Sequence, residues 1–129
     1  MNSPYHRYLY HRHLIEGRLK RDALATKPVR NSKHAAAICY KGQIITLGTC
    51  QKKTHPMMMK YQDRPERIYL HAEIDAIIKF INMYGTKPLK KCSLVVVRVN
   101  NEGELMPSKP CKGCQKAIKA FKIKEVIWS

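Results

Sequence analysis

HAEIDAIIKFINMY, residues 71–84, is the stretch that decides the fold. Four isoleucines recur in it at the three- and four-residue spacing that places side chains on one face of an α-helix. They are Ile74, Ile77, Ile78 and Ile81, while Asp75, Lys79 and Asn82 fall on another face. Gly85 follows, and glycine commonly ends a helix. The stretch therefore predicts a helix that covers a core with its isoleucine face.

Strands are predicted on both sides of this helix. Residues 35–40 and 43–47 are short apolar runs around Lys41-Gly42, a pattern typical of a tight hairpin. Residues 93–99 are rich in β-branched side chains, which predicts a strand buried on both faces, and Asn100 to Gly103 then turn the chain. These segments favour an α/β fold with a mixed sheet of about four to five strands.

A second helix is predicted to begin at Pro110. Its apolar stripe would consist of Cys114, Ala117, Ile118 and Phe121, with Lys112, Lys116 and Lys119 on the opposite side. Residues 125–128 follow as a last short strand, which the helical crossover would place parallel to the strand before it. This strand would complete the predicted sheet.

Two further segments carry weaker patterns. Residues 5–25 predict a basic N-terminal helix, although Gly17 interrupts its periodicity. From Gly48 to Tyr69 the periodicity disappears, so we expect a long irregular connection there. Loops of that length in compact domains are often functional.

The charge balance is strongly basic. Lys and Arg number 25 against 9 Asp and Glu, which gives a formal net charge of +16. Such a field attracts phosphate-bearing partners, and the alternative is a solvated surface kept soluble by repulsion. No apolar run approaches the roughly 20 residues of a membrane span, and the N-terminus lacks a secretion signal. We therefore expect a cytoplasmic protein with no membrane partner.

Two short motifs carry the chemistry. His71-Ala72-Glu73 opens one predicted helix, and Pro110-Cys111-Lys112-Gly113-Cys114 opens the other. A Cys-x-x-Cys at a helix start lets two thiolates reach one metal ion, and the helix dipole favours their ionised form. The chain has five Cys, an odd number that argues against a disulfide framework. With His71, the motifs predict a zinc ion on His71, Cys111 and Cys114 with one open position, as in catalytic zinc sites.

Glu73 follows His71 by two residues, too close in a helix's first turn to be a second ligand. It is well placed to lie over a water activated by the metal, where a carboxylate acts as general base and then general acid. We predict that Glu73 passes the proton of this water to a ring nitrogen and then to a departing amine. The products would be a keto base and ammonia.

HAE followed by PCxxC resembles the signature of the zinc-dependent cytidine and deoxycytidylate deaminase superfamily. The hairpin, HAE helix, strand, PCxxC helix and final strand also follow the order of that family over about residues 30 to 129. The resemblance implies a three-layer α/β/α domain, zinc on the three ligands named above and Glu73 as proton shuttle. We expect one domain over residues 1–129, with a basic N-terminal helical segment at 1–30 and the catalytic core at 31–129.

The resemblance also suggests a substrate. The stretch AIKAFKIKEVIWS, residues 117–129, is more similar to small, phage-encoded deoxycytidylate deaminases than to tRNA adenosine enzymes. It implies deamination of cytosine to uracil in a nucleotide, in the host cytoplasm for a phage-encoded member. The backbone of Ala72 would contact the substrate.

Three features depart from the family pattern. Cys50 stands where relatives commonly use Asn to bind the sugar, and Lys109 replaces a Ser or Glu that acts through its backbone carbonyl. Both positions stay candidates for substrate contacts. The sequence also stops after the last predicted strand, where many relatives continue. We therefore predict a homo-oligomer with sites near subunit boundaries, unless the N-terminal helix supplies the missing pocket wall.

Two other functions remain open. A deaminase of single-stranded DNA or tRNA, acting on cytosine or adenine, would use the basic surface to follow a phosphate backbone and tyrosines to stack on bases. The candidate tyrosines are Tyr5, Tyr8, Tyr10 and Tyr61. A non-catalytic, zinc-stabilised nucleic-acid-binding module would instead close the metal with a fourth ligand such as Cys50 or Cys92. Without such a closure, Cys39 and Cys92 are expected to be core residues.

Overall fold

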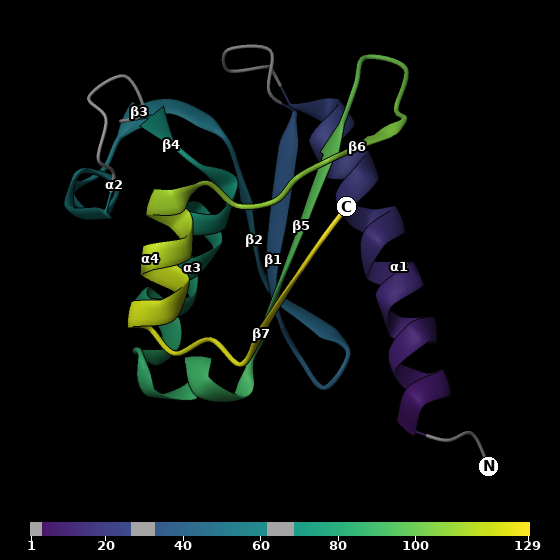
Figure 1. Ribbon diagram of the computed structural model, residues 1–129, viewed down its shortest axis with the longest axis horizontal. Helices are drawn as coiled ribbons and strands as arrows, with labels where there is room; N and C mark the ends of the chain where they lie inside the picture. The colour runs from purple at the N-terminus through teal and green to yellow at the C-terminus, as the bar shows by residue number, and fades with distance from the viewer. Residues whose placement is uncertain (1–3, 27–32, 62–68) are drawn as a thin grey trace.

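A five-stranded mixed sheet forms the centre of the computed structural model (Figure 1). The structure describes residues 4–26, 33–61 and 69–129, and for residues 4–13 it describes the backbone alone. The strands are β1 (His34–Tyr40), β2 (Gln43–Thr49), β5 (Ser93–Val99), β6 (Leu105–Met106) and β7 (Glu125–Trp128). β1 is antiparallel to both β2 and β5, whereas β7 is parallel to β5. The predicted hairpin and the predicted parallel last strand are both confirmed.

The β1–β2 turn has the backbone that its sequence predicts. Lys41 and Gly42 both have positive φ, at 49° and 77°. A two-residue hairpin turn with both central residues in this region matches the right-handed twist of the strands it joins. The turn thereby sets the register that starts at Tyr40 opposite Gln43.

Helices cover both faces of the sheet and divide its core in two. α3 (Ala72–Tyr84) and α4 (Lys112–Ala120) pack on one face, where Ala36 and Ile38 of β1 point. α1 (Pro4–Ala25) packs on the other face, against Ala35, Ala37 and Cys39. This alternation along one strand is the physical basis of the three-layer α/β/α arrangement, which confirms the predicted fold class. α1 also continues as a helix through Gly17.

The expectation of an irregular connection from Gly48 to Tyr69 is wrong in part. β2 continues to Thr49, and β3 (Gln51–Thr54) pairs with β4 (Tyr69–Leu70) in a second, two-stranded sheet. α2 (Pro56–Tyr61) lies between them. Three of the four β3 residues are exposed, so this strand has no apolar alternation for a sequence pattern to detect. Residues 62–68 of the predicted connection lie outside the described residues.

Short elements also flank α3 and α4. A 3-10 helix, η2 (Lys87–Lys91), follows α3, and β6 pairs with the end of β5. Neither was predicted, because each is too short to show a periodicity. The second helix begins at Lys112, later than the predicted Pro110, because Cys111 is its N-cap.

Gly48 brings α3 against the sheet. A Cβ atom at this position would collide with the backbone carbonyl oxygen of Ala72 and the backbone nitrogen of Ala76. Thr46 on the same strand donates a hydrogen bond of 2.9 Å from its Oγ1 to the carbonyl oxygen of Ala76. The first turns of α3 therefore lie directly on β2, which fixes where this helix begins.

Candidate metal and active site

The side chains of both motifs project from helix N-termini. His71 is the N-cap of α3 and Cys111 is the N-cap of α4, and both have extended backbone angles. The Sγ atom of Cys111 accepts a hydrogen bond of 3.4 Å from the backbone N–H of Cys114. Both helix N-termini lie at the same end of the sheet (Figure 1). Residues that are distant in the sequence thereby reach one place.

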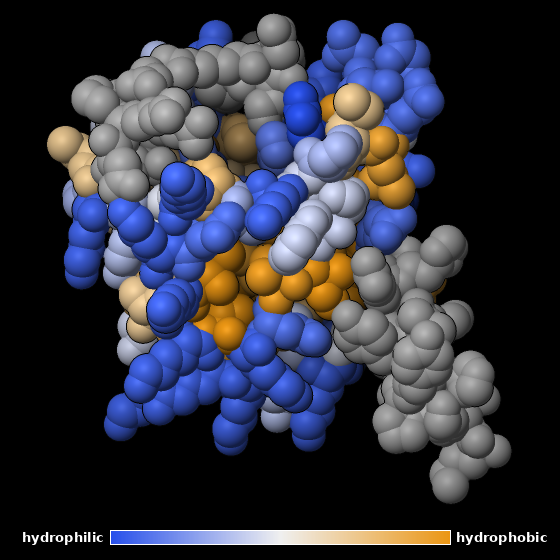
Figure 2. Space-filling view, in the orientation of Figure 1, coloured by the Kyte–Doolittle hydropathy of each residue, from blue (hydrophilic) through white to orange (hydrophobic). Residues whose placement is uncertain are grey.

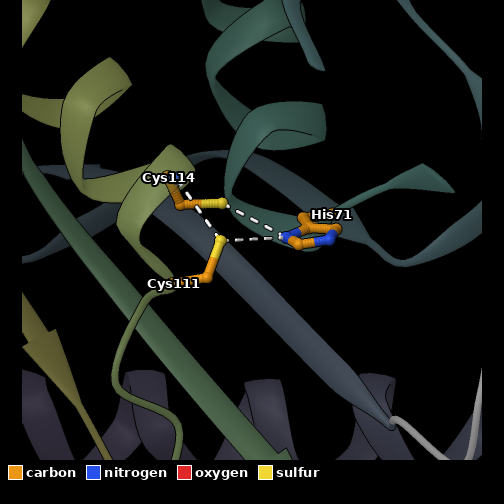
Figure 3. Close-up of side chains that lie close together, drawn as sticks. All are labelled: His71, Cys111 and Cys114. Carbon is orange, nitrogen blue, oxygen red and sulfur yellow. Dashed lines mark hydrogen bonds between the residues drawn. The ribbon is translucent and has the colours of Figure 1, made fainter. Parts of the chain in front are cut away.

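His71, Cys111 and Cys114 point toward one another (Figure 3). The Nδ1 atom of His71 lies 3.6 Å from Sγ of Cys111 and 3.3 Å from Sγ of Cys114. In a tetrahedral site with Zn–S near 2.3 Å and Zn–N near 2.0 Å, nitrogen and sulfur ligands lie about 3.5 Å apart. The spacing of these three side chains therefore fits a zinc ion.

Within the described residues, these three side chains form the only group of three or more His, Cys, Asp or Glu that could hold a metal ion. Their ligand atoms all lie within 4.8 Å of one another. Three protein ligands leave one position of a tetrahedral zinc for water or substrate. The predicted ligand set is thus brought together, with the stoichiometry of an open site.

Glu73 lies beside this cluster, in the first turn of α3. Its side chain is buried, with 5% exposure, and makes a side-chain hydrogen bond with Cys114. Burial raises the pKa of the Glu73 carboxyl, and the neighbouring His71 opposes that rise. A buried carboxyl with a raised pKa can accept a proton and release it again, as a general base that becomes a general acid must do.

The environment also acts on the Cys114 thiol. Its pKa is raised well above the usual value, first by its hydrogen bond with Cys111, then by burial and the charge of Glu73. A divalent cation works in the opposite direction, because thiol ligands bind a metal as thiolates. Metal binding by His71, Cys111 and Cys114 should therefore release protons from the thiols.

A model of the cytidine and deoxycytidylate deaminase zinc-binding region matches residues 12–129. The chain belongs to this family. The match extends from the predicted catalytic core into α1, and it makes zinc the cofactor that the three clustered ligands fit.

The fold is also similar to a solved structure of guanine deaminase from Bacillus subtilis. The TM-score is 0.59 at 23% sequence identity, over 91% of this chain and 62% of that chain. The chain thus spans less than two thirds of that protein's length, and the likeness concerns the fold. A search of curated proteins found no match. In the part of the chain that the structure describes, no helix is long and apolar enough to cross a membrane.

The position of Asp75 differs from the one predicted from the sequence. We expected it on a polar helix face, but it is 4% exposed. Its Oδ2 accepts hydrogen bonds from the backbone N–H of Thr49, the Nε2 of Gln51 and the Nζ of Lys79, at 3.0–3.1 Å. Asp75 therefore holds the chain on both sides of Cys50. Its spacing of four residues from Lys79 was the only signal in the sequence.

The remaining predicted residues are dispersed. Cys50 is half-buried and packs against the α3–α4 core, but it is not part of the metal cluster. Lys109 is exposed, and Ala72 is buried where α3 meets Gly48. Cys92 donates a hydrogen bond of 3.3 Å from its thiol to the carbonyl oxygen of Pro88. Cys39 is also buried, so the expectation of core positions for Cys39 and Cys92 is confirmed.

Sequence reasoning missed His34, which lies close to the metal ligands. Burial and, to a lesser extent, the charges of Arg98 and His71 lower the pKa of its imidazole to about 4, although Cys111 opposes this shift. His34 is therefore neutral at neutral pH. No local motif marks it, because its neighbours come from β5, α3 and α4.

Proposed function

We propose that this chain is a hydrolytic deaminase that converts cytosine to uracil in a nucleotide such as deoxycytidylate. The observation that carries the proposal is the cluster of His71, Cys111 and Cys114 with the buried Glu73 against it. A closed structural zinc site does not need a buried carboxyl beside its ligands. A deaminase needs such a group to move protons.

The proposed chemistry assigns one task to each side chain. A zinc ion with three protein ligands, when bound, lowers the pKa of water to about 7 and so supplies a nucleophile at neutral pH. His71, Cys111 and Cys114 would hold the ion. The Glu73 carboxylate would accept the proton of the attacking water, pass it to the ring nitrogen next to the amino-bearing carbon, and deliver the next proton to the departing amine. One water is consumed and one ammonia is released for each base.

The choice of a nucleotide rests on charge and on the sequence resemblance. The net charge of +16 favours a phosphate-bearing substrate. Residues 117–129 resemble deoxycytidylate deaminases rather than tRNA adenosine enzymes. The structurally similar protein is named a guanine deaminase, so guanine belongs among the substrates to be tested.

A polynucleotide substrate is the second candidate, and a specific surface favours it. Lys109, Lys112 and Lys116 are exposed around the start of α4, next to the metal ligands. Figure 2 shows hydrophilic side chains over much of this face, with an apolar area in its middle. Of the tyrosines expected to stack on bases, Tyr61 is half-buried, with its ring 6.3 Å from that of Phe121. The side chains of Tyr5, Tyr8 and Tyr10 lie outside the described residues.

Ammonia release from a panel of substrates tests the proposal. The panel comprises deoxycytidylate, cytidine, guanine, single-stranded DNA and tRNA, with Glu73→Ala as the control. We expect deoxycytidylate to be the best substrate and the variant to be inactive. Turnover of single-stranded DNA or tRNA alone, with binding that weakens steeply as salt rises, would support the second candidate instead. Equal rates for the variant and the parent protein would refute the assigned mechanism.

A non-catalytic zinc module gains little support from the site. Its fourth ligand would have to come from Cys50 or Cys92, and neither belongs to the metal cluster in the described part of the chain. Cys92, the C-cap of η2, instead donates its thiol hydrogen bond to the carbonyl oxygen of Pro88. The position of Glu73 beside Cys114 also fits catalysis better than a closed site.

Assembly, domain extent and location belong to the same proposal. We propose that residues 1–129 act as one deaminase domain in the cytoplasm and that this domain forms a homo-oligomer. β7 pairs with β5 and carries Val126, Ile127 and the 40% exposed Trp128, which would suit a subunit contact. Light scattering during size-exclusion chromatography tests the oligomer. A fully active monomer would exclude a site shared between subunits.

A further inference from the structure

His34 and Arg98 are direct partners across two neighbouring strands. His34 is the first residue of β1 and lies opposite Arg98, near the end of the antiparallel strand β5. Side chains along a strand alternate between the two faces of a sheet. Ala36 on β1 and Val96 on β5 both belong to the core beneath α3 and α4. His34 and Arg98, each two residues further along, therefore point toward the same face as the metal cluster.

The pair also lies at the end of that face where the metal cluster is found. β1 begins and β5 ends where α3 and α4 have their N-termini (Figure 1). The imidazole of His34 lies within electrostatic reach of Arg98, His71 and Cys111, and each of them affects its charge. The strand register and these charge effects both place His34 on the side of the sheet that carries the proposed metal ligands.

Cys50, directly after the end of β2, lies on the side of His34 away from Arg98. Thr49 pairs with Ala35, so the next residue, Cys50, comes beside His34 at the same edge of the sheet. Cys50 packs against the α3–α4 core, which places it on the same face. The hydrogen bonds of Asp75 to Thr49 and Gln51 hold this corner in place. Cys50, His34 and Arg98 thereby follow one another along one edge of the sheet, on the face that α3 and α4 cover.

The chemistry of the pair is that of a hydrogen-bond donor site. A guanidinium carries five N–H donors and no acceptor, and it remains charged at every accessible pH. An imidazole ring adds at least one N–H donor. Donors of this kind bind phosphate or carbonyl oxygens, with a strong contribution from the charge of Arg.

We propose that His34 and Arg98 together bind an oxygen of the substrate beside the metal site and so contribute to its selection. The proposal rests on the proposed function, because it assigns this edge to the pocket of the same reaction. The oxygen belongs either to the phosphate of a nucleotide or to the carbonyl group of the base. Both are acceptors for the same donors, and two ligands distinguish them.

Calorimetric binding of deoxycytidylate and deoxycytidine to the zinc-loaded full chain tests the pair. Glu73→Gln is used as the parent background, so that turnover is greatly slowed during the titration. Arg98→Gln and His34→Phe are introduced into it, and each is expected to raise the Kd at least about tenfold, the size of a lost charge-assisted hydrogen bond. A rise for deoxycytidylate alone assigns the phosphate, and an equal rise for both ligands assigns the base carbonyl.

Arg18→Gln is the matched control. It removes one Arg from α1, on the opposite face of the sheet, where the side chain pairs with Asp22 at 3.1 Å. Arg98→Lys keeps the charge and should restore part of the affinity. Zinc content and thermal unfolding are measured for every variant to show that folding and metal binding are retained. If Arg98→Gln does not fold, the Kd values of Arg98→Lys and His34→Phe test the proposal instead.

Two outcomes would overturn the assignment. One is that no site variant changes either Kd more than Arg18→Gln does. The other is that the parent protein binds neither ligand. The proposed function fails in a different way, when the wild-type chain releases no ammonia although binding still depends on Arg98. The two failures are therefore distinguishable.

Discussion

The Nδ1 atom of His71 lies 3.3 Å from the Sγ atom of Cys114, although 43 positions of sequence separate the two residues. The contact joins the N-termini of α3 and α4, which are otherwise held together by the core beneath them. A metal ion at this point would link both helices. Metal binding and folding of this face of the sheet should therefore be coupled.

Loss of a single thiol should remove the metal. Cys111→Ser is expected to lower the zinc content of the purified protein from about one ion per chain to well below half, since two ligands bind zinc poorly. Elemental analysis by mass spectrometry measures this content. Cys39→Ala, in the core on the other side of the sheet, is the control and should retain zinc. Equal zinc in both variants would remove Cys111 from the ligand set.

Replacing Glu73 should separate catalysis from metal binding. Glu73→Gln keeps the size of the side chain but cannot exchange protons, so kcat should fall by about 10²- to 10⁴-fold, the usual contribution of general acid–base catalysis. Zinc content should stay at the level of the wild-type protein. A variant that loses zinc and activity together would instead assign Glu73 a structural role.

Gly48→Ala should strongly destabilise the protein. The new methyl group would collide with the backbone of α3 at Ala72 and Ala76, and backbone atoms cannot move aside as flexible side chains do. We expect a loss of about 2–4 kcal/mol in the free energy of unfolding, measured with urea. Gly17→Ala is the matched control, because no atom lies within 4 Å of its new Cβ. That change should stabilise α1 by about 0.5–1 kcal/mol.

Acid should destabilise the protein partly through His34. Its pKa is lowered from 6.5 to about 4 in the folded chain, so unfolding is accompanied by proton uptake between these two pH values. The stabilising contribution is complete above pH 6.5 and is lost as the pH falls toward 4. It amounts to about 3 kcal/mol when the shift is converted to free energy.

His34→Phe isolates this contribution. The variant cannot take up the proton, so its unfolding free energy should fall less than that of the wild-type protein between pH 7 and pH 4. Protonation of the metal ligands affects both proteins and cancels in the difference. Parallel stability curves for the two proteins would show that His34 titrates normally in the folded chain.

Much of the fold could be predicted because its longest elements follow simple patterns. The isoleucine spacing predicted α3, the Lys41-Gly42 turn predicted the β1–β2 hairpin, and the β-branched run predicted β5. Each depends on neighbours within a few residues, where helix or strand periodicity dominates. The metal ligands were predicted for the same reason, since HAE and PCxxC are local motifs that bring a known chemistry together.

The features that were missed depend on contacts between distant segments. Asp75 lies at a position that helix periodicity assigns to a polar face, yet the backbone N–H of Thr49 and the amide of Gln51 satisfy its carboxylate when it is buried. His34 is placed beside Arg98 by strand register, which the sequence around either residue does not specify. β3 has exposed side chains and therefore no apolar pattern.

The coordination of zinc in the purified protein tests the central claim most directly. X-ray absorption at the zinc edge should show two sulfur ligands at about 2.3 Å, from Cys111 and Cys114, and two nitrogen or oxygen ligands at about 2.0–2.1 Å, from His71 and a water. A shell with three or four sulfur atoms would mean that another cysteine closes the site. That result would contradict an open, catalytic metal centre.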